Sequence, residues 1–289
     1  MAEAALVTAE SILALTPIII KKTPLDPLSA IWSRLLSSAV LGYGLAGDRR
    51  LGAREIGGAL ALGYTNLVHV ASSYESFRHL PAGQAMSILY TYPLWNLLFV
   101  AYFNGEKITS REYSLVGIAA VGSILLNMNP GAAALPVAGA NKVNPVWGVF
   151  MALLMALTES GMHTILRMMK WTDPARAVWI VNTSASLWLG GAMAIQQLAF
   201  GVEQQTWTGT WWDQVLLTSF NSLSIFTGYW LRYYAVPRLP SSVYSMLSYT
   251  GLLASYLFGL AFLGEIPGWQ SVLGALIIMA AGLALQLEA

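Results

Sequence analysis

Glu159, His163 and Arg167 stand four residues apart in an otherwise apolar segment of the sequence. That spacing places the three side chains on one face of a helix. A carboxylate beside a histidine can carry a proton, and an arginine can bind a carboxylate or phosphate through charge-assisted hydrogen bonds. The three side chains could equally neutralise one another along the helix edge, with Arg167 extending to solvent at the helix end. The pattern is therefore a candidate binding site with a structural role as its alternative.

Polar side chains also recur at steps of three or four residues in several other apolar segments. Such groups are costly in an apolar environment and normally face the protein interior or a wet cavity. Tyrosines beside them offer walls that stack on planar or apolar parts of a solute. The alternative is that small hydroxyl residues merely let helices pack closely. The residues predicted to bind a small-molecule substrate are Asn66, His69, Ser73, Tyr74, Tyr90, Glu159, His163, Asn221, Tyr229, Arg232, Tyr233 and Tyr249.

Proton coupling and charge attraction are two further roles that ionisable residues suggest. Glu10 in the first apolar segment could carry a coupled proton, as could Glu159 with His163. Glu10 also lies near the expected start of its helix, where the helix dipole stabilises an anion without any further role. Arg232 is the candidate for attracting an anionic group of the solute, assisted by Lys21 or Lys22.

Motifs of an enzyme are missing from the sequence. It contains no H-E-x-x-H, no G-x-S-x-G and no glycine-rich phosphate loop, and its three histidines, His69, His79 and His163, are scattered. With zero cysteines, disulfides, thiolate metal sites and a cysteine nucleophile are excluded. We therefore expect no catalytic residues, no metal site and no cofactor.

The composition is that of an integral membrane protein. Of 289 residues, 56% are apolar and 10% are charged, with a mean hydropathy of +0.58, whereas a soluble domain is about 25% charged. The net charge of +1 gives no footprint for nucleic acid. The first segment has no basic region before its apolar part, which argues against a cleaved signal peptide. The lipid bilayer is the expected partner, and association into a homodimer is left open.

Apolar segments of about spanning length predict an all-α protein with ten transmembrane helices. A stretch rich in Pro, Ala and Gly divides the chain into residues 1–128, a linker over 129–145, and residues 146–289. The predicted spans are 4–21, 28–46, 55–77, 82–102, 112–128, 146–168, 176–200, 213–235, 241–263 and 268–286.

Basic residues predict the orientation, because Lys and Arg near short loops accumulate on the cytoplasmic side. Nine of them fall on the side that both termini share and four on the other side. Both termini are therefore expected in the cytoplasm, with the plasma membrane, or inner membrane, as the expected location. The nine are Arg49, Arg50, Arg54, Lys107, Arg111, Arg167, Lys170, Arg176 and Arg238.

An internal repeat relates the two halves. At an offset of 159 residues, Leu80-Pro81 aligns with Leu239-Pro240 and Tyr90-Thr91 with Tyr249-Thr250. Each half has five predicted spans, an odd number, so the second copy would enter the membrane in the opposite orientation, as an inverted-topology repeat. Gly105-Glu106 and Gly264-Glu265 also align. Their predicted role is structural: glycine ends one helix, and glutamate lies at the positive start of the next.

The ten spans, Arg34 within "AIWSRLLSSAVL", the segment "LPAGQAMSILYTYPLWNLL" and the segment "GEKITSREYSLVGIAAVGSILL" together resemble the drug/metabolite transporter superfamily. Within it, the chain is most similar to EamA-like permeases. The resemblance implies an alternating-access carrier for a small organic metabolite such as an amino acid, nucleobase or related solute. It also implies that Arg34 supports structure. The alternatives are a channel, or a scaffold or lipid-interacting protein without carrier activity.

Overall fold

The computed structural model describes residues 1–22, 26–80, 82–126, 144–201, 210–263 and 268–286. Regular structure in these residues is helical throughout, with no strand among them. The helices are α1 Ala2–Leu13, α2 Thr16–Lys22, α3 Pro27–Leu45, α4 Ala53–His79, α5 Ala82–Leu89, α6 Tyr92–Phe99, η1 Val100–Asn104, α7 Ser110–Leu126, α8 Pro145–Met169, α9 Pro174–Phe200, α10 Trp211–Phe220, η2 Asn221–Ile225, α11 Phe226–Ala235, α12 Ser241–Leu263 and α13 Trp269–Gln286.

Every predicted span is helical, but the capacity to cross a membrane differs among the helices. Four segments of the described residues are long and apolar enough by themselves: Ala2–Ile20, Pro145–Met169, Pro174–Ala199 and Ser241–Phe262. The remaining predicted spans are shorter or less apolar. That all ten cross a membrane, and that the halves form an inverted repeat, stay predictions.

Three predicted spans are interrupted rather than continuous, which corrects the expectation of single helices over 4–21, 82–102 and 213–235. The first breaks between Leu13 and Thr16, and the fourth between Leu89 and Tyr92. Prolines explain both breaks, because Pro17 and Pro93 follow closely and cannot donate the backbone hydrogen bond that would continue the helix.

The third interruption has a different cause, because the predicted eighth span passes through the π-helix η2 between α10 and α11. Such a bulge widens one turn of the helix and is common at functional sites. In the other half, the residue that aligns with Pro93 is Leu252, and α12 accordingly continues without a break.

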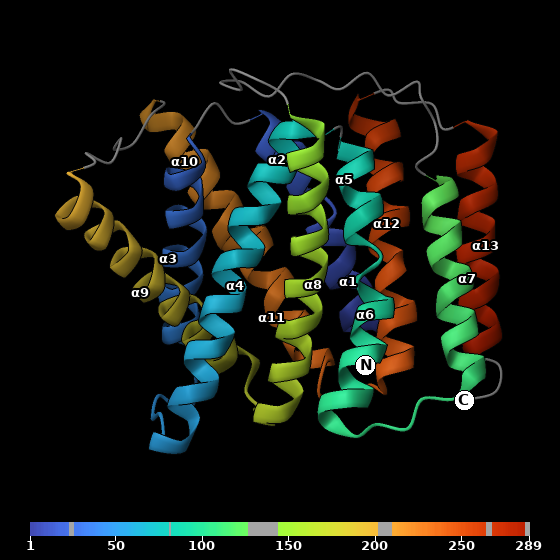
Figure 1. Ribbon diagram of the computed structural model, residues 1–289, viewed down its shortest axis with the longest axis horizontal. Helices are drawn as coiled ribbons and strands as arrows, with labels where there is room; N and C mark the ends of the chain where they lie inside the picture. Colours follow the sequence, from blue (N-terminus) through green and yellow to red (C-terminus); the bar gives the residue numbers. More distant parts are fainter. Residues whose placement is uncertain (23–25, 81, 127–143, 202–209, 264–267, 287–289) are drawn as a thin grey trace.

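The helices lie side by side in one bundle, in which α1 begins and α13 ends toward the same end (Figure 1). α4 packs against α8 and α9, and α3 also packs against α9. α1 packs against both α11 and α12, while α7 and α13 pair at the edge of the bundle. Segments far apart in the sequence therefore meet around α1, α4, α8 and α11.

Aspartate and proline start two of these helices in the same way. Asp26 accepts a hydrogen bond from the Ser29 backbone nitrogen at 2.9 Å. Asp173 accepts bonds from the Ala175 and Arg176 nitrogens at 2.9 and 3.2 Å. Proline follows each aspartate at the first helical position. Its fixed φ suits a helix there, and an N–H at this position would have no hydrogen-bond partner within the helix. Both Asp-Pro pairs, Asp26-Pro27 and Asp173-Pro174, are thus helix starts.

The first Gly-Glu pair has its predicted glycine conformation but not its predicted glutamate role. Gly105 ends η1 with φ 69°, the left-handed conformation that favours glycine. Glu106, however, lies before α7, and Arg167 donates to it at 3.4 Å. The acid in the first turn of α7 is Glu112, which accepts from the Thr109 nitrogen at 2.7 Å. The second pair, Gly264 and Glu265, lies outside the described residues, as does most of the predicted linker.

Close approach of α3 and α9 depends on Gly42. A Cβ there would lie 2.7 Å from the Trp179 nitrogen and 3.0 Å from the Ala175 oxygen. Because these are backbone atoms, the two helices would have to separate. We expect Gly42→Ala to lower the free energy of unfolding by about 1–3 kcal/mol, measured by thermal unfolding in detergent.

Gly44 on the same helix is the matched control, because a Cβ there would meet no atom within 4 Å. We expect Gly44→Ala to raise stability by about 0.5–1 kcal/mol through helix propensity. Equal melting temperatures for the two variants would contradict the close approach of α3 and α9.

Candidate functional site

A buried ionic cluster joins three helices, α1, α8 and α11, that are far apart in the sequence. The Arg232 guanidinium on α11 donates to both carboxylate oxygens of Glu10 on α1, with nitrogen to oxygen distances of 2.7 to 3.0 Å. Its Nη1 also donates to Oε1 of Glu159 on α8. The three residues are at most 5% exposed. One cation therefore serves two carboxylates, so the cluster carries one negative charge in excess when both are ionised.

The position of Glu10 differs from the one predicted. Because α1 ends at Leu13, Glu10 lies in its last turn, at the negative end of the helix dipole. The dipole therefore does not stabilise this carboxylate, and the described contacts assign that task to Arg232.

Two histidines lie beside Glu159. His69 Nδ1 is 3.4 Å from Glu159 Oε2, but the same nitrogen lies 3.1 Å from the Met155 carbonyl oxygen. On α8 itself, His163 Nε2 is 3.6 Å from Glu159 Oε1 and 2.9 Å from the Tyr244 hydroxyl. If His69 donates from Nδ1 to the carbonyl, its Nε2 is an acceptor. Glu159 Oε2 then receives no hydrogen bond, in agreement with its lack of a partner among the described residues.

A second polar chain runs from Arg34 toward the same histidine. Arg34 Nη2 on α3 donates to the Tyr229 hydroxyl at 2.9 Å, and that hydroxyl lies 3.5 Å from His69 Nε2. The Tyr229 ring lies between two guanidiniums, whose carbons are 5.2 Å (Arg34) and 5.4 Å (Arg232) from its centroid. Tyr229 thus connects the two buried arginines by ring and hydroxyl contacts.

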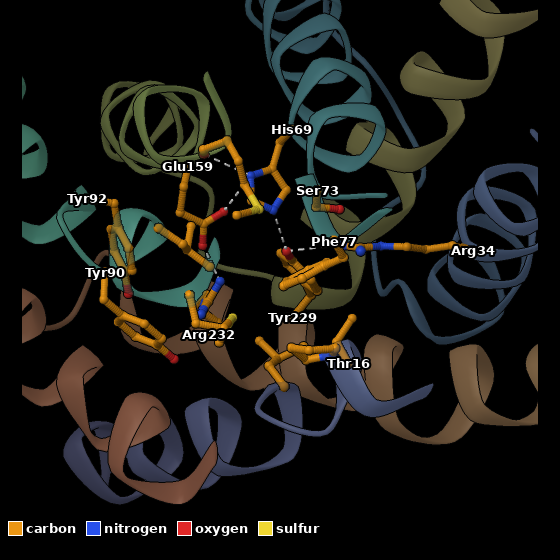
Figure 2. A pocket seen from close by; sticks show the side chains of 15 residues that line it. Thr16, Arg34, His69, Ser73, Phe77, Tyr90, Tyr92, Glu159, Tyr229 and Arg232 are labelled. Carbon is orange, nitrogen blue, oxygen red and sulfur yellow. Dashed lines mark hydrogen bonds and ion pairs between the residues drawn. The ribbon is translucent and has the colours of Figure 1, made fainter. Parts of the chain in front are cut away.

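A cavity opens between these groups (Figure 2). The cavity volume, counted as the space that the centre of a water molecule can occupy, is about 60 Å³. One water molecule needs about 10–15 Å³ on that measure. A few waters therefore fit, whereas a larger solute requires the surrounding helices to move. Two helix breaks contribute to the wall, at Leu13 with Thr16 and at Tyr90 with Tyr92. The remaining lining residues are Pro17, Arg34, His69, Ser73, Phe77, Met86, Leu89, Met155, Glu159, Tyr229 and Arg232.

Half of the predicted substrate-binding residues line this cavity. They are His69, Ser73, Tyr90, Glu159, Tyr229 and Arg232, and Figure 2 shows them converging from α4, α8, α11 and the break before α6. Arg34, which was predicted to be structural, also lines the cavity. His163 does not line the cavity, but it contacts two residues that do: its Nε2 lies 3.6 Å from Glu159 Oε1, and its ring packs edge-on against Tyr92.

The other predicted binding residues fasten helices together or pack in the core. Asn66 donates to Asn182 of α9 at 3.3 Å, and Asn221 donates to Ser33 of α3 at 3.1 Å. The Tyr249 hydroxyl is 3.5 Å from the Val116 carbonyl oxygen of α7. Buried in the core outside the cavity wall are Tyr74 and Tyr233.

Two tyrosines of the site were not predicted from the sequence. Tyr92 lines the cavity and is 1% exposed. Tyr244 is fully buried and contacts His163. Pro93 was the available signal for Tyr92, because a proline in a spanning segment marks a break where side chains face a cavity. Tyr244 gave no comparable signal.

Polar contacts join α4 to its neighbours at both ends of the bundle. At one end, Trp147 of α8 donates to Glu75 at 3.3 Å, and Glu75 also pairs with Arg78 at 3.0 Å. At the other end, Arg176 of α9 donates to Glu55 at 2.9 Å. At that end Arg167 also pairs with Glu106. The partner of Glu159 is Arg232, and not Arg167 as one of the predicted alternatives had it. The cavity lies between these two sets of contacts along α4.

Comparison with known proteins gives a family match for the first part of the chain and a fold for nearly all of it. Residues 1–128 match the model of the EamA-like transporter family. One solved protein crystal structure is similar over 99% of this chain and 99% of its own, with a TM-score of 0.75 and 15% sequence identity. At that identity the likeness shows a shared fold alone. No curated protein matches the chain by sequence.

Proposed function

We propose that the chain is a secondary transporter of the drug/metabolite transporter superfamily, since residues 1–128 match the model of the EamA-like transporter family. It carries a small organic metabolite, such as an amino acid, nucleobase or related solute, by alternating access. The family consists of membrane transporters of small solutes and not of enzymes. The residues proposed to act on the solute are those that line the central cavity.

The observation that carries this proposal is the ionic cluster of Glu10, Glu159 and Arg232 beside a cavity. Ionisable side chains at membrane depth are expensive and mark solute or proton pathways when they face a cavity. Interrupted helices support the same conclusion, because transporters commonly build their sites where spanning helices break. The breaks at Ala14 and at Tyr90 both adjoin the cavity.

The proposed movement opens one end of the bundle at a time. The two halves, residues 1–128 and 146–289, would rock around the cavity as structural repeats do in other carriers. Opening one end would separate α4 from α8 at Glu75 and Trp147, and opening the other would separate α4 from α9 at Glu55 and Arg176. We place both termini in the cytoplasm and the protein in the plasma membrane. Proton coupling through Glu10 or through Glu159 with His163 belongs to the same proposal.

Counterflow in liposomes tests the proposal. Purified protein is reconstituted into vesicles preloaded with unlabelled amino acids or nucleobases, and uptake of the labelled solute is followed. A carrier accelerates labelled uptake when its own solute is inside, because the loaded site reorients in both directions. Uptake that is fast but indifferent to preloading would indicate a channel, and uptake equal to that of protein-free vesicles would contradict transport. An imposed pH gradient, with and without a protonophore, tests proton coupling.

A further inference from the structure

Arg34 differs from the other buried arginine of the cavity in having no acidic partner. It is 5% exposed, and its one described hydrogen bond is donated to the neutral Tyr229 hydroxyl at 2.9 Å. Among the described residues, no carboxylate lies within 4.0 Å of its guanidinium. Arg232, by contrast, is held by two carboxylates. A buried cation without a counter-ion is costly, so an anionic group of the solute is the natural partner for Arg34.

The opposite wall has the complementary property. Glu159 Oε2 is buried and accepts no hydrogen bond within the described part of the chain. Its nearest polar neighbour is His69 Nδ1 at 3.4 Å, a nitrogen that also contacts the Met155 carbonyl oxygen. Because Glu10 and Glu159 share one guanidinium, this side of the cavity has a negative charge left over. A cationic donor on the solute would satisfy both the charge and the free oxygen.

The two walls together constrain the charge of the solute. When both glutamates are ionised, the cluster of Glu10, Arg232 and Glu159 contributes one net negative charge, which balances the positive charge of Arg34. A solute that brings a single unbalanced charge into this poorly solvated space would disturb that balance, whereas one that carries both signs would not.

We propose that the transported solute is a zwitterion, with its carboxylate bound by Arg34 and its ammonium group bound by Glu159. This inference rests on the proposed carrier function and names the substrate class of the same site. Arg232 holds the two glutamates in place and is not the anion-binding cation, which reverses the roles that the sequence predicted for the two arginines. The apolar part of the solute lies against the aromatic wall of Phe77, Tyr90 and Tyr92.

A series of matched solutes tests the charge requirement. Alanine, leucine and phenylalanine are each compared with the corresponding amide, which lacks the carboxylate charge, and the deaminated acid, which lacks the ammonium group. Uracil and glucose serve as neutral solutes and glycerol 3-phosphate as a dianion. In counterflow, a zwitterion is expected to compete best, and its amide and deaminated acid to bind about 10- to 100-fold more weakly.

Variants then assign the carboxylate to Arg34. Arg34→Gln is expected to lower the affinity for the zwitterion to the affinity for its amide. The affinity for the amide itself is expected to stay unchanged. Arg111→Gln makes the same substitution at an exposed site, where Arg111 donates to the Ala284 carbonyl oxygen, and is expected to keep the wild-type preference. If Arg34→Gln gives no monodisperse protein, Arg34→Lys serves instead and is expected to weaken only the charged carboxylate series.

Three results would overturn the inference. Transport of uracil, glucose or the dianion in preference to every zwitterion would refute the charge assignment while preserving the carrier function. A folded Arg34 variant with an unchanged preference for the zwitterion over its amide would remove Arg34 from the site. Absence of counterflow with all these solutes would refute the proposed function and this inference together.

Discussion

Replacing Arg232 with methionine is expected to lower the stability of the protein by about 3–5 kcal/mol, because it leaves two buried carboxylates without their shared cation. Glu10 and Glu159 are 0% and 1% exposed, so bulk solvent does not replace the guanidinium, and the few waters that fit in the cavity carry no charge to balance the two carboxylates. Thermal unfolding in detergent and the yield of monodisperse protein measure the loss. Arg232→Lys is expected to recover only part of it, since an ammonium group cannot bind Glu10 through two nitrogens as the guanidinium does.

A triple variant separates the electrostatic loss from the loss of packing. Glu10→Gln/Glu159→Gln/Arg232→Met removes all three charges together, and replacing a buried ionic group by neutral residues is often neutral or stabilising. We expect its melting temperature to recover much but not all of the loss, because Arg34 is then left without the negative charge of the cluster, and we expect no recovery of counterflow. A triple variant as unstable as Arg232→Met alone would show that the side chain of Arg232 acts through packing and not through charge balance.

Joining the ends of α4 and α8 by a disulfide is expected to stop transport almost completely. Gly148 of α8 lies against the last turn of α4, and a Cβ built on it would be 2.9 Å from the His79 Cβ. A disulfide requires about 3.5–4.5 Å between Cβ atoms, so His79→Cys/Gly148→Cys needs only a small adjustment. Because the proposed movement separates α4 from α8 at this end, the oxidised variant should hold that end closed.

The chain itself supplies a clean background for this experiment, since it contains zero cysteines. Counterflow is measured in the oxidised protein, after reduction with a phosphine, and in each single-cysteine variant. Recovery on reduction is the expected result. Full activity in a protein shown by mass spectrometry to be cross-linked would mean that α4 and α8 move as one unit at this end.

Periodicity predicted the helices well and their continuity poorly. Apolar length is a strong signal, and the predicted span 146–168 corresponds to α8 at Pro145–Met169. Continuity depends on individual residues. Pro17 and Pro93 account for two of the breaks, whereas no sequence pattern marked the π-helix at Asn221–Ile225. Backbone hydrogen bonding at a bulge depends on contacts with other helices, and these are not visible in a local sequence window.

The candidate site could be predicted as a set of residue types but not as a set of pairs. Helical spacing identified Glu159, His69 and Arg232 as inward-facing, and all three line the cavity. It could not show that Arg232 pairs with two acids while Arg34 pairs with none in the part of the chain that the structure describes. Glu10 and Arg232 are 222 residues apart in the sequence. They pair because α1 packs against α11, and helical spacing within one segment cannot predict which helices pack together.

The pairing of Glu10 with Arg232 also determines the order in which the protein can be completed during biosynthesis. Glu10 is made early and its counter-ion 222 residues later, which at about 5–20 residues per second leaves the carboxylate alone for roughly 10 to 45 s. Residues 1–128 contain neither Glu159 nor Arg232. The ionic centre is therefore among the last parts to form in a nascent chain, and the first helix cannot acquire its final partners until the ribosome has made α11.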